Sequence, residues 1–165
     1  MSWLTRRRSR RRSPCHITRA TRQLASRARR QVRDTAPVPD GDLSTQWRIL
    51  DAFAAAARDG DFDALVAVLD PDVVLRADLG AGAPGRMTEV RGATLVAKQA
   101  AGYASVGLVM RPALVNGAAG AVSTRDGQLF SVGGFTVRGG KIVEIDILAD
   151  PARLHELDLT ALGAA

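Results

Sequence analysis

The chain has 165 residues, of which 46% are hydrophobic, and a formal net charge of +6. This length is enough for one domain plus a tail, and the apolar fraction is ordinary for a globular protein. The single cysteine, Cys15, excludes an intramolecular disulfide and a cysteine metal cluster, and no apolar run reaches the roughly 18 residues of a membrane helix.

Positive charge is concentrated at the N-terminal end. Residues 1–34 contain 12 arginines and one acid, a net charge of +11, whereas residues 35–165 contain 11 basic residues and 16 acids, a net charge of −5. A block of like charge is typical of a disordered or nucleic-acid-binding arm. The block lacks the apolar core of a secretory signal, although an arginine-rich, acid-poor start is also compatible with a transit peptide. The excess of arginine over lysine favours a GC-rich bacterial genome.

Three segments precede the globular part. Residues 1–17 show no apolar periodicity, and we expect a disordered basic arm there. Residues 18–33 predict a basic helix with a narrow apolar stripe, because apolar residues recur every four positions. That stripe consists of Leu24, Ala28 and Val32. Residues 34–44 contain two prolines and three aspartates, which predict a linker.

The remaining segment, 45–160, carries the patterns of a folded domain that begins near Ser44, a good helix N-cap. Apolar residues at helical spacing alternate with short strand-like runs in its first half. We expect helices over about 45–59, 62–69 and 93–103, a short helix from Pro151, and strands over 72–79 and 87–91.

The second half of the domain predicts a meander of four strands. The strands are expected over about 107–115, 118–124, 128–138 and 141–148. The dipeptides Asn116-Gly117, Asp126-Gly127 and Gly139-Gly140 separate them, and each is a strong two-residue hairpin signal. The whole order predicts an α+β layer with helices on one face of a curved antiparallel sheet.

The last hairpin, 128–148, allows a register to be predicted. If Arg138 faces Lys141 across the turn, Thr136 faces Val143 and the strands continue pairwise from there. One face of the sheet then carries Val132, Val143, Ile145 and Ile147, and we expect that face to be buried. The other face carries Phe135, Val137, Ile142, Leu148, Glu144 and Asp146, with Asp146 opposite Gly133.

The order of elements and three motifs resemble the SnoaL-like branch of the cystatin-like cone fold, which includes ketosteroid isomerases and nuclear transport factor two. The motifs are 70–78 (DPDVVLRAD), 111–120 (RPALVNGAAG) and 150–154 (DPARL). They look like those of SnoaL-like domains fused to extracytoplasmic-function sigma factors. The resemblance covers 45–160 and implies a SnoaL-like cone with three helices on its sheet, preceded by the basic helical arm.

The basic helix supports the same resemblance. Residues 22–30 (RQLASRARR) are similar to the last helix of sigma region 4, which reads promoter DNA in that family. The resemblance implies DNA contacts by Arg22, Gln23, Arg27, Arg29 and Arg30. The chain then looks like a truncated or misjoined sigma factor, which keeps this helix and the C-terminal extension. A recognition helix needs a partner helix to hold it in the groove, so we expect weak, salt-sensitive and non-specific DNA binding.

The segment 111–120 contains the family's Asn-Gly-x-x-Gly motif, formed here by Asn116, Gly117 and Gly120. The resemblance implies a regulatory contact between this motif and the sigma core. The geometry of a hairpin turn explains Asn116 and Gly117 equally well. The two interpretations do not exclude each other, and both stay open.

Four charged residues are candidates to line a pocket of the cone: Arg76, Asp78, Glu144 and Asp146. In isomerases and cyclases of this fold, a pocket carboxylate removes a proton beside a carbonyl and a hydrogen-bond donor stabilises the oxyanion. Here the core contains no histidine, and the only tyrosine, Tyr103, lies on a predicted helix. We therefore expect pocket or edge carboxylates without chemistry.

Two hypotheses follow. The first is a non-catalytic SnoaL-like regulatory domain of a sigma-factor-derived protein in transcription initiation, acting on RNA polymerase or a sigma core in trans. The second is a small-molecule-binding enzyme of the polyketide cyclase or ketosteroid isomerase type, with Asp146 as its base. We expect no metal ion or other cofactor, no membrane partner and a cytoplasmic location. A homodimer through the open sheet is a further expectation.

Overall fold

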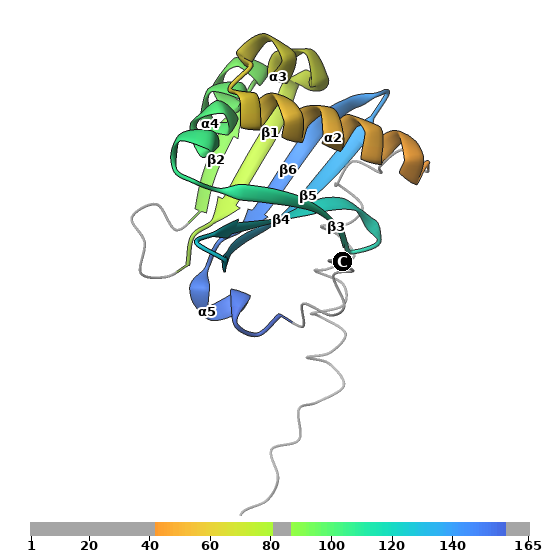
Figure 1. The fold of residues 1–165 in the computed structure, drawn as a ribbon. Coiled ribbons are helices and arrows are strands. Elements are labelled where there is room, and N and C mark those ends of the chain that lie inside the picture. The colour runs from red at the N-terminus through yellow and green to blue at the C-terminus, as the bar shows by residue number, and fades with distance from the viewer. Residues whose placement is uncertain (1–41, 81–86, 158–165) are drawn as a thin grey trace, which may run out of the picture. The chain divides into compact units, whose positions relative to one another are not determined.

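A computed structural model describes residues 42–80 and 87–157 of the chain. In this part, helices pack on one face of a curved sheet of six strands (Figure 1). The element order is the one that the sequence predicts: two helices, two strands, a helix, four strands and a short helix. The expected α+β cone is therefore confirmed.

Three helices cover one face of the sheet, and a fourth, very short one follows the last strand. They are α2 (Leu43–Asp59), α3 (Phe62–Val68), α4 (Ala93–Ser105) and α5 (Pro151–Leu154). The cap of α2 is Asp42, whose side chain accepts a hydrogen bond from the Ser44 backbone N–H, so Ser44 is inside the helix and not its cap. Helix α2 thus begins two residues inside the segment predicted to be a linker. Both residues are good caps, and the carboxylate of Asp42 also accepts from the hydroxyls of Ser44 and Thr45.

The sheet has the strand order β2-β1-β6-β5-β4-β3. The strands are β1 (Leu69–Asp78), β2 (Met87–Arg91), β3 (Val109–Val115), β4 (Ala118–Arg125), β5 (Gln128–Arg138) and β6 (Lys141–Leu148). All neighbours are antiparallel except β1 and β6, which run parallel, so the sheet is mixed where a purely antiparallel one was predicted. The parallel pair brings two segments about 70 residues apart in the sequence side by side.

The three predicted hairpin turns are confirmed. Both residues of each dipeptide have positive φ, from 52° at Asp126 to 80° at Gly117, as a type I′ turn requires. Asparagine, aspartate and glycine tolerate this conformation better than other residues, so the turns could be predicted from the sequence.

The predicted register of the last hairpin holds for its first two pairs and is wrong beyond them. Arg138 does face Lys141, but Thr136 faces Glu144 and Gly134 faces Asp146, because Val143 forms a bulge. One extra residue in one strand moves every later side chain to the other face. Gly133 therefore faces Ile147, not Asp146.

The bulge changes which side chains share a face. Ile145 and Ile147 lie with Phe135, Val137 and Ile142 under the helices, a surface that we call the helix face. The opposite surface, the open face, contains a second and smaller apolar cluster that includes Val132 and Leu148. The charged residues of the open face include Arg76, Asp78, Glu144 and Asp146, which alternate with helix-face residues along β1 and β6.

The main core lies between the helices and the helix face. Leu50, Leu65 and Ile142 have relative exposures of 1% or less. The rings of Phe53 on α2 and Phe135 on β5 meet edge to face, with centroids 5.5 Å apart. Burying each large aliphatic side chain contributes about 1.5–3 kcal/mol, so this layer supplies most of the apolar stabilisation of the domain.

Candidate functional site

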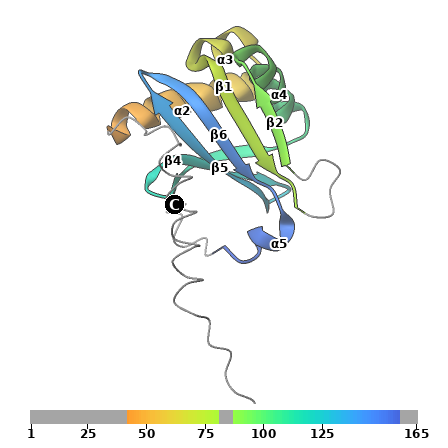
Figure 2. The same ribbon diagram turned by 180° about the vertical axis from the view of Figure 1, so that it is seen from behind.

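Each of the three motifs that carry the family resemblance contributes residues to the open face. Figure 2 shows the sheet from this side, with β1 and β6 in front of α2. The end of β1 lies beside α5, and α5 packs on β5. The segment 111–120 contributes β3, the turn and the start of β4 to the same face. Motifs far apart in the sequence therefore form one surface.

Helix α5 is tied to the end of β1 by polar contacts. Asp150 caps the helix by accepting from the Ala152 N–H, and Pro151 occupies its first turn. The guanidinium of Arg153 forms an ion pair with the carboxylate of Asp78. The backbone N–H of Ala149 also donates to the Asp78 carbonyl. These contacts join the DPARL segment to the last residues of DPDVVLRAD.

An apolar contact holds α5 from its other side. Leu154 is only 6% exposed and packs with Ala113, Val122 and Val132 of three successive strands. Val115, Leu129, Leu148 and Leu157 extend this cluster at its edges.

The Asn-Gly-x-x-Gly motif forms the β3–β4 turn and the strand after it. Asn116 and Gly117 are exposed at the tip with φ of 53° and 80°, so the turn interpretation holds for both. Gly120 is buried, and a Cβ there would lie 2.5 Å from Val115 Cγ2 and 2.7 Å from the Gly133 carbonyl oxygen. A side chain cannot fit at this position, so packing alone requires glycine.

An ionic cluster crosses three strands of the open face around Arg76. The guanidinium of Arg76 donates to Glu89 on β2 at 3.1 Å and to Glu144 on β6, and Asp146 lies 3.7 Å away. Arg91 adds a second contact to Glu89 at 2.7 Å. Glu144 is the buried member, with its side chain 11% exposed, whereas the side chain of Asp146 is 62% exposed. The cluster joins the edge strand to the centre of the sheet.

The acids of this cluster are in different electrostatic settings. Hydrogen bonds from Arg91 and then from Arg76 lower the pKa of Glu89 below its ordinary value. Partial desolvation raises the pKa of Asp146, and the positive charge of Arg76 opposes that rise. Arg76 therefore stabilises Glu89 in its charged form more than it stabilises Asp146.

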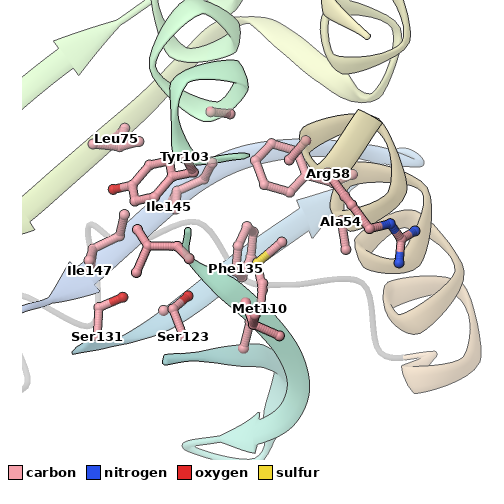
Figure 3. Close-up of a pocket in the computed structure, with 17 residues that line it drawn as sticks. Ala54, Arg58, Leu75, Tyr103, Met110, Ser123, Ser131, Phe135, Ile145 and Ile147 are labelled. Carbon is pink, nitrogen blue, oxygen red and sulfur yellow. The ribbon is translucent and has the colours of Figure 1, made fainter. Parts of the chain in front are cut away.

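The prediction that Arg76, Asp78, Glu144 and Asp146 line the cone pocket is corrected. A cavity of about 220 Å³ does lie between the helices and the sheet (Figure 3), but its lining comes from the helix face. Leu75, Ile145 and Ile147 point into it, and the four charged residues alternate with them and point the other way. For Glu144 and Asp146 the error follows from the bulge at Val143, which exchanges the faces of β6, whereas Arg76 and Asp78 share their face through the pairing of β1 with β6.

The lining of this cavity is mainly apolar. Among the described residues, its polar members are Arg58, Tyr103, Ser123 and Ser131, and none of the described lining residues is an acid or a histidine. Burial raises the pKa of the Tyr103 hydroxyl, so this group stays protonated at neutral pH. A cyclase or isomerase that removes a proton beside a carbonyl needs a base in its pocket, and Asp146 is on the far side of the sheet. The enzymatic alternative is therefore not favoured.

Several residues of the site were not predicted. The sequence analysis did not predict the ion pair between Arg153 and Asp78. A basic residue shortly after Asp-Pro and an acid at the end of a strand are the signal that suggests it. The contacts of Arg76 with Glu144 and Asp146 depend on the parallel β1–β6 pairing, which has no local sequence signal. Ser123 and Ser131 face each other across β4 and β5 on the cavity side, and only the register places them there.

The predicted DNA-binding residues, Arg22, Gln23, Arg27, Arg29 and Arg30, lie outside the described residues, as do the predicted arm and basic helix. The part of the chain that the structure describes contains no helix long and apolar enough to cross a membrane.

Comparisons with known proteins find relatives that are similar to most of the chain. No family model matches the chain. The sigma factor SigJ of Mycobacterium tuberculosis is 33% identical over 153 residues, which cover 80% of this chain and 46% of SigJ. The probable sigma factor SigI of the same organism is 29% identical over 136 residues, which cover 82% of this chain and 46% of SigI. The chain thus spans about half the length of these curated relatives.

A comparison of the structure with solved structures also finds SigJ. The crystal structure of SigJ matches with a TM-score of 0.55 and 29% identity over 85% of this chain and 51% of SigJ. An NTF2-like protein of unknown function from Mesorhizobium loti matches with a TM-score of 0.53 at 18% identity, over 68% of this chain and 97% of that one, which shows the fold alone. The chain is homologous to the extracytoplasmic-function sigma factors SigJ and SigI, and its described domain has the SnoaL-like fold found in SigJ.

Proposed function

We propose that this chain acts in transcription initiation as a non-catalytic regulatory domain that binds a sigma core, or RNA polymerase carrying one, in trans. The observation that carries the proposal is the meeting of all three family motifs on the open face, in a chain homologous to SigJ. A site for chemistry would place charged residues in the cavity, whereas the motif residues Arg76, Asp78 and Arg153 lie on the open face.

The open face has the properties of a docking surface. Its shape is fixed by the Arg76 cluster, by the Asp78–Arg153 pair and by Leu154 beneath α5. Exposed groups stand on this rigid base, among them Asn116 and Gly117 at the turn and Arg111 on β3. Together with Gly120, which lets β3 and β4 approach closely, Asn116 and Gly117 form the proposed regulatory contact.

The proposed partner fits this mixture of apolar and charged groups. Protein interfaces combine a packed apolar centre with a polar rim, and charge pairs across them set orientation more than affinity. The open face offers an apolar cluster beside acids and arginines of both signs. The partnership with RNA polymerase implies a cytoplasmic location.

A second contact is proposed for the N-terminal segment. Its net charge of +11 over residues 1–34 favours attachment to DNA phosphates, with Arg22, Gln23, Arg27, Arg29 and Arg30 as contact residues. Binding by phosphate contacts alone weakens steeply with salt and does not distinguish sequences. Deleting residues 1–40 should remove most salt-sensitive affinity for duplex DNA and leave the unfolding temperature nearly unchanged. A large loss of thermal stability would contradict the division into arm and domain.

Co-purification tests the central proposal. The tagged full chain is mixed with RNA polymerase core enzyme, with an intact SigJ-type sigma factor, and with both. Retention of the sigma factor or of the complex supports the proposal, and retention of core enzyme alone would place the contact on polymerase. If nothing is retained in any mixture at 100 mM salt, the regulatory role is wrong.

The expected homodimer would use the same open face as the proposed sigma contact. Two copies that pair through this face would cover the surface proposed for the sigma core, so the two associations would compete. Size-exclusion chromatography with light scattering gives the mass of the chain alone. Addition of the sigma core should convert a dimer into a heterodimer, whereas a dimer that binds the sigma core without dissociating uses another surface.

A further inference from the structure

A buried side chain of α2 reaches the strand that follows the Asn-Gly turn, which is formed by Asn116 and Gly117. Gln46 is 4% exposed, and its side-chain carbonyl oxygen accepts a hydrogen bond of 3.1 Å from the backbone N–H of Ala119, 73 positions away in the sequence. The start of α2 and the β3–β4 turn lie on the same side of the domain in Figure 1 and in Figure 2. Polar side chains are seldom buried without a hydrogen-bond partner, and this bond gives Gln46 one.

The backbone N–H of Ala119 is satisfied by this side chain instead of by a neighbouring strand. The pairing of β4 with β5 begins one residue later, at Gly120. On its other side Ala119 lies opposite Leu114 of β3, two residues after Pro112. Proline has no N–H and is tolerated where its nitrogen points away from the partner strand, and every second residue of a strand has the same orientation. The N–H of Ala119 therefore points away from β3, and the amide of Gln46 takes the place of a strand.

Small residues after the turn let α2 come close enough for this bond. Ala119 and Ala121 are 1% and 3% exposed and belong to the core under the helices. Gly120, between them, is confined within the sheet by Val115 and the Gly133 carbonyl. The strand that carries the turn is thus held from the helix layer at one residue and within the sheet at the next.

The first turn of α2 holds Gln46 in turn. The carbonyl oxygen of Asp42 accepts a hydrogen bond of 3.1 Å from the Gln46 N–H, and the Asp42 carboxylate caps the helix by accepting from the Ser44 N–H at 3.0 Å. These bonds fix the backbone from which the Gln46 side chain extends. A change at the start of α2 therefore reaches the Asn-Gly turn through one buried side chain.

We infer that Gln46 is a positioning residue for the Asn-Gly turn. By holding Ala119, it fixes where Asn116 and Gly117 are presented to a partner. The inference rests on the proposed function, because this turn belongs to the contact proposed for the sigma core. It extends that contact to the helix layer, whose residues otherwise lie on the far side of the sheet.

NMR of the isotope-labelled full chain tests the inference. Gln46→Met keeps the length of the side chain and removes the acceptor. The amide signals of Asn116 and Gly117 should shift, and the Ala119 amide should exchange with solvent about tenfold faster, the effect of losing one buried hydrogen bond. Asp42→Ala, at an exposed position, is a milder variant that loosens the same turn of α2 and should shift the same signals in the same direction.

The matched control is Leu65→Val on α3, a helix that packs on α2, α4 and β1. It removes buried volume from the core but should leave the signals of Asn116 and Gly117 in place. Unmoved turn signals in Gln46→Met, or equal shifts in Leu65→Val, would overturn the inference.

The affinity for an intact SigJ-type sigma factor provides the second measurement. Gln46→Met should weaken binding about threefold to tenfold, whereas Leu65→Val should leave it unchanged although it also lowers stability. Turn signals that move without any change in affinity would overturn the link between Gln46 and the contact. If the wild-type chain binds no sigma factor, the proposed function fails, and the NMR shifts still decide whether Gln46 positions the turn.

Discussion

The two faces of the sheet are built by different interactions. The helix face is apolar, lies under three helices and encloses a cavity, whereas the open face carries an ionic cluster and one short helix. The charged motif residues follow this difference, since Arg76, Asp78 and Arg153 lie on the open face. A fold-level likeness to small-molecule enzymes therefore says little about the surface on which this chain is proposed to act.

The contrast between the two faces predicts that the core under the helices contributes more to the free energy of unfolding than the apolar cluster under α5. Leu50→Ala, which empties a site under the helices, should lower the free energy of unfolding by about 2–5 kcal/mol. Leu154→Ala removes the same atoms from under α5 and should cost less, because a helix of four residues can shift to close the gap. Urea unfolding of both variants measures the difference. Equal losses would mean that the open face contributes to the core as much as the helix face does.

Glycine at position 120 should be required for packing. Gly120→Ala forces a Cβ against Val115 and the Gly133 carbonyl, and we expect a loss of about 1–3 kcal/mol. Gly134→Ala is the matched control on the neighbouring strand, where the nearest atom, Val115 Cγ1, is 3.8 Å from the added Cβ. Thermal unfolding compares the two, and a tolerated Gly120→Ala would favour a purely regulatory reason for the motif.

Removing the cation of the ionic cluster should destabilise the open face. Arg76→Ala leaves Glu144, Glu89 and Asp146 close together without their shared partner, and we expect a loss of about 1–2 kcal/mol at pH 7. The loss should shrink as the pH falls toward 4, because protonation removes the repulsion. Arg48→Ala, at an exposed position on α2, is the control. A loss that does not change with pH would indicate lost packing rather than unpaired charge.

The smallest expected effect concerns Asp146. Its pKa is raised in the folded state, so its ionisation opposes folding: stability is greatest below the ordinary pKa and falls as the pH rises through the raised one. Asp146→Asn should therefore raise the unfolding temperature slightly at pH 7 and leave it unchanged at pH 3. Differential scanning calorimetry at both pH values measures this. A lower unfolding temperature at pH 7 would show that the attraction to Arg76 outweighs desolvation.

Local signals made much of the fold predictable. Dipeptides such as Asn116-Gly117 strongly favour a tight hairpin turn. Because a strand ends where such a turn begins, the turns also predicted the limits of the strands. The bulge at Val143 could not be predicted, since valine fits a regular strand equally well. The bulge at this residue places Asp146 on the open face, which is why the prediction that Asp146 lines the pocket was wrong. The ion pairs of Arg76 depend on contacts between distant segments, which no local pattern reports.

The most direct test compares charge reversals on the two faces. Arg111 on β3 is exposed on the open face, and Arg48 on α2 is exposed on the helix side, so Arg111→Glu and Arg48→Glu change the charge equally. The affinity of each full-length variant for an intact SigJ-type sigma factor is measured by biolayer interferometry. The account predicts that Arg111→Glu weakens binding at least tenfold and Arg48→Glu leaves it unchanged. Equal affinities for both, or a loss only with Arg48→Glu, would contradict docking through the open face.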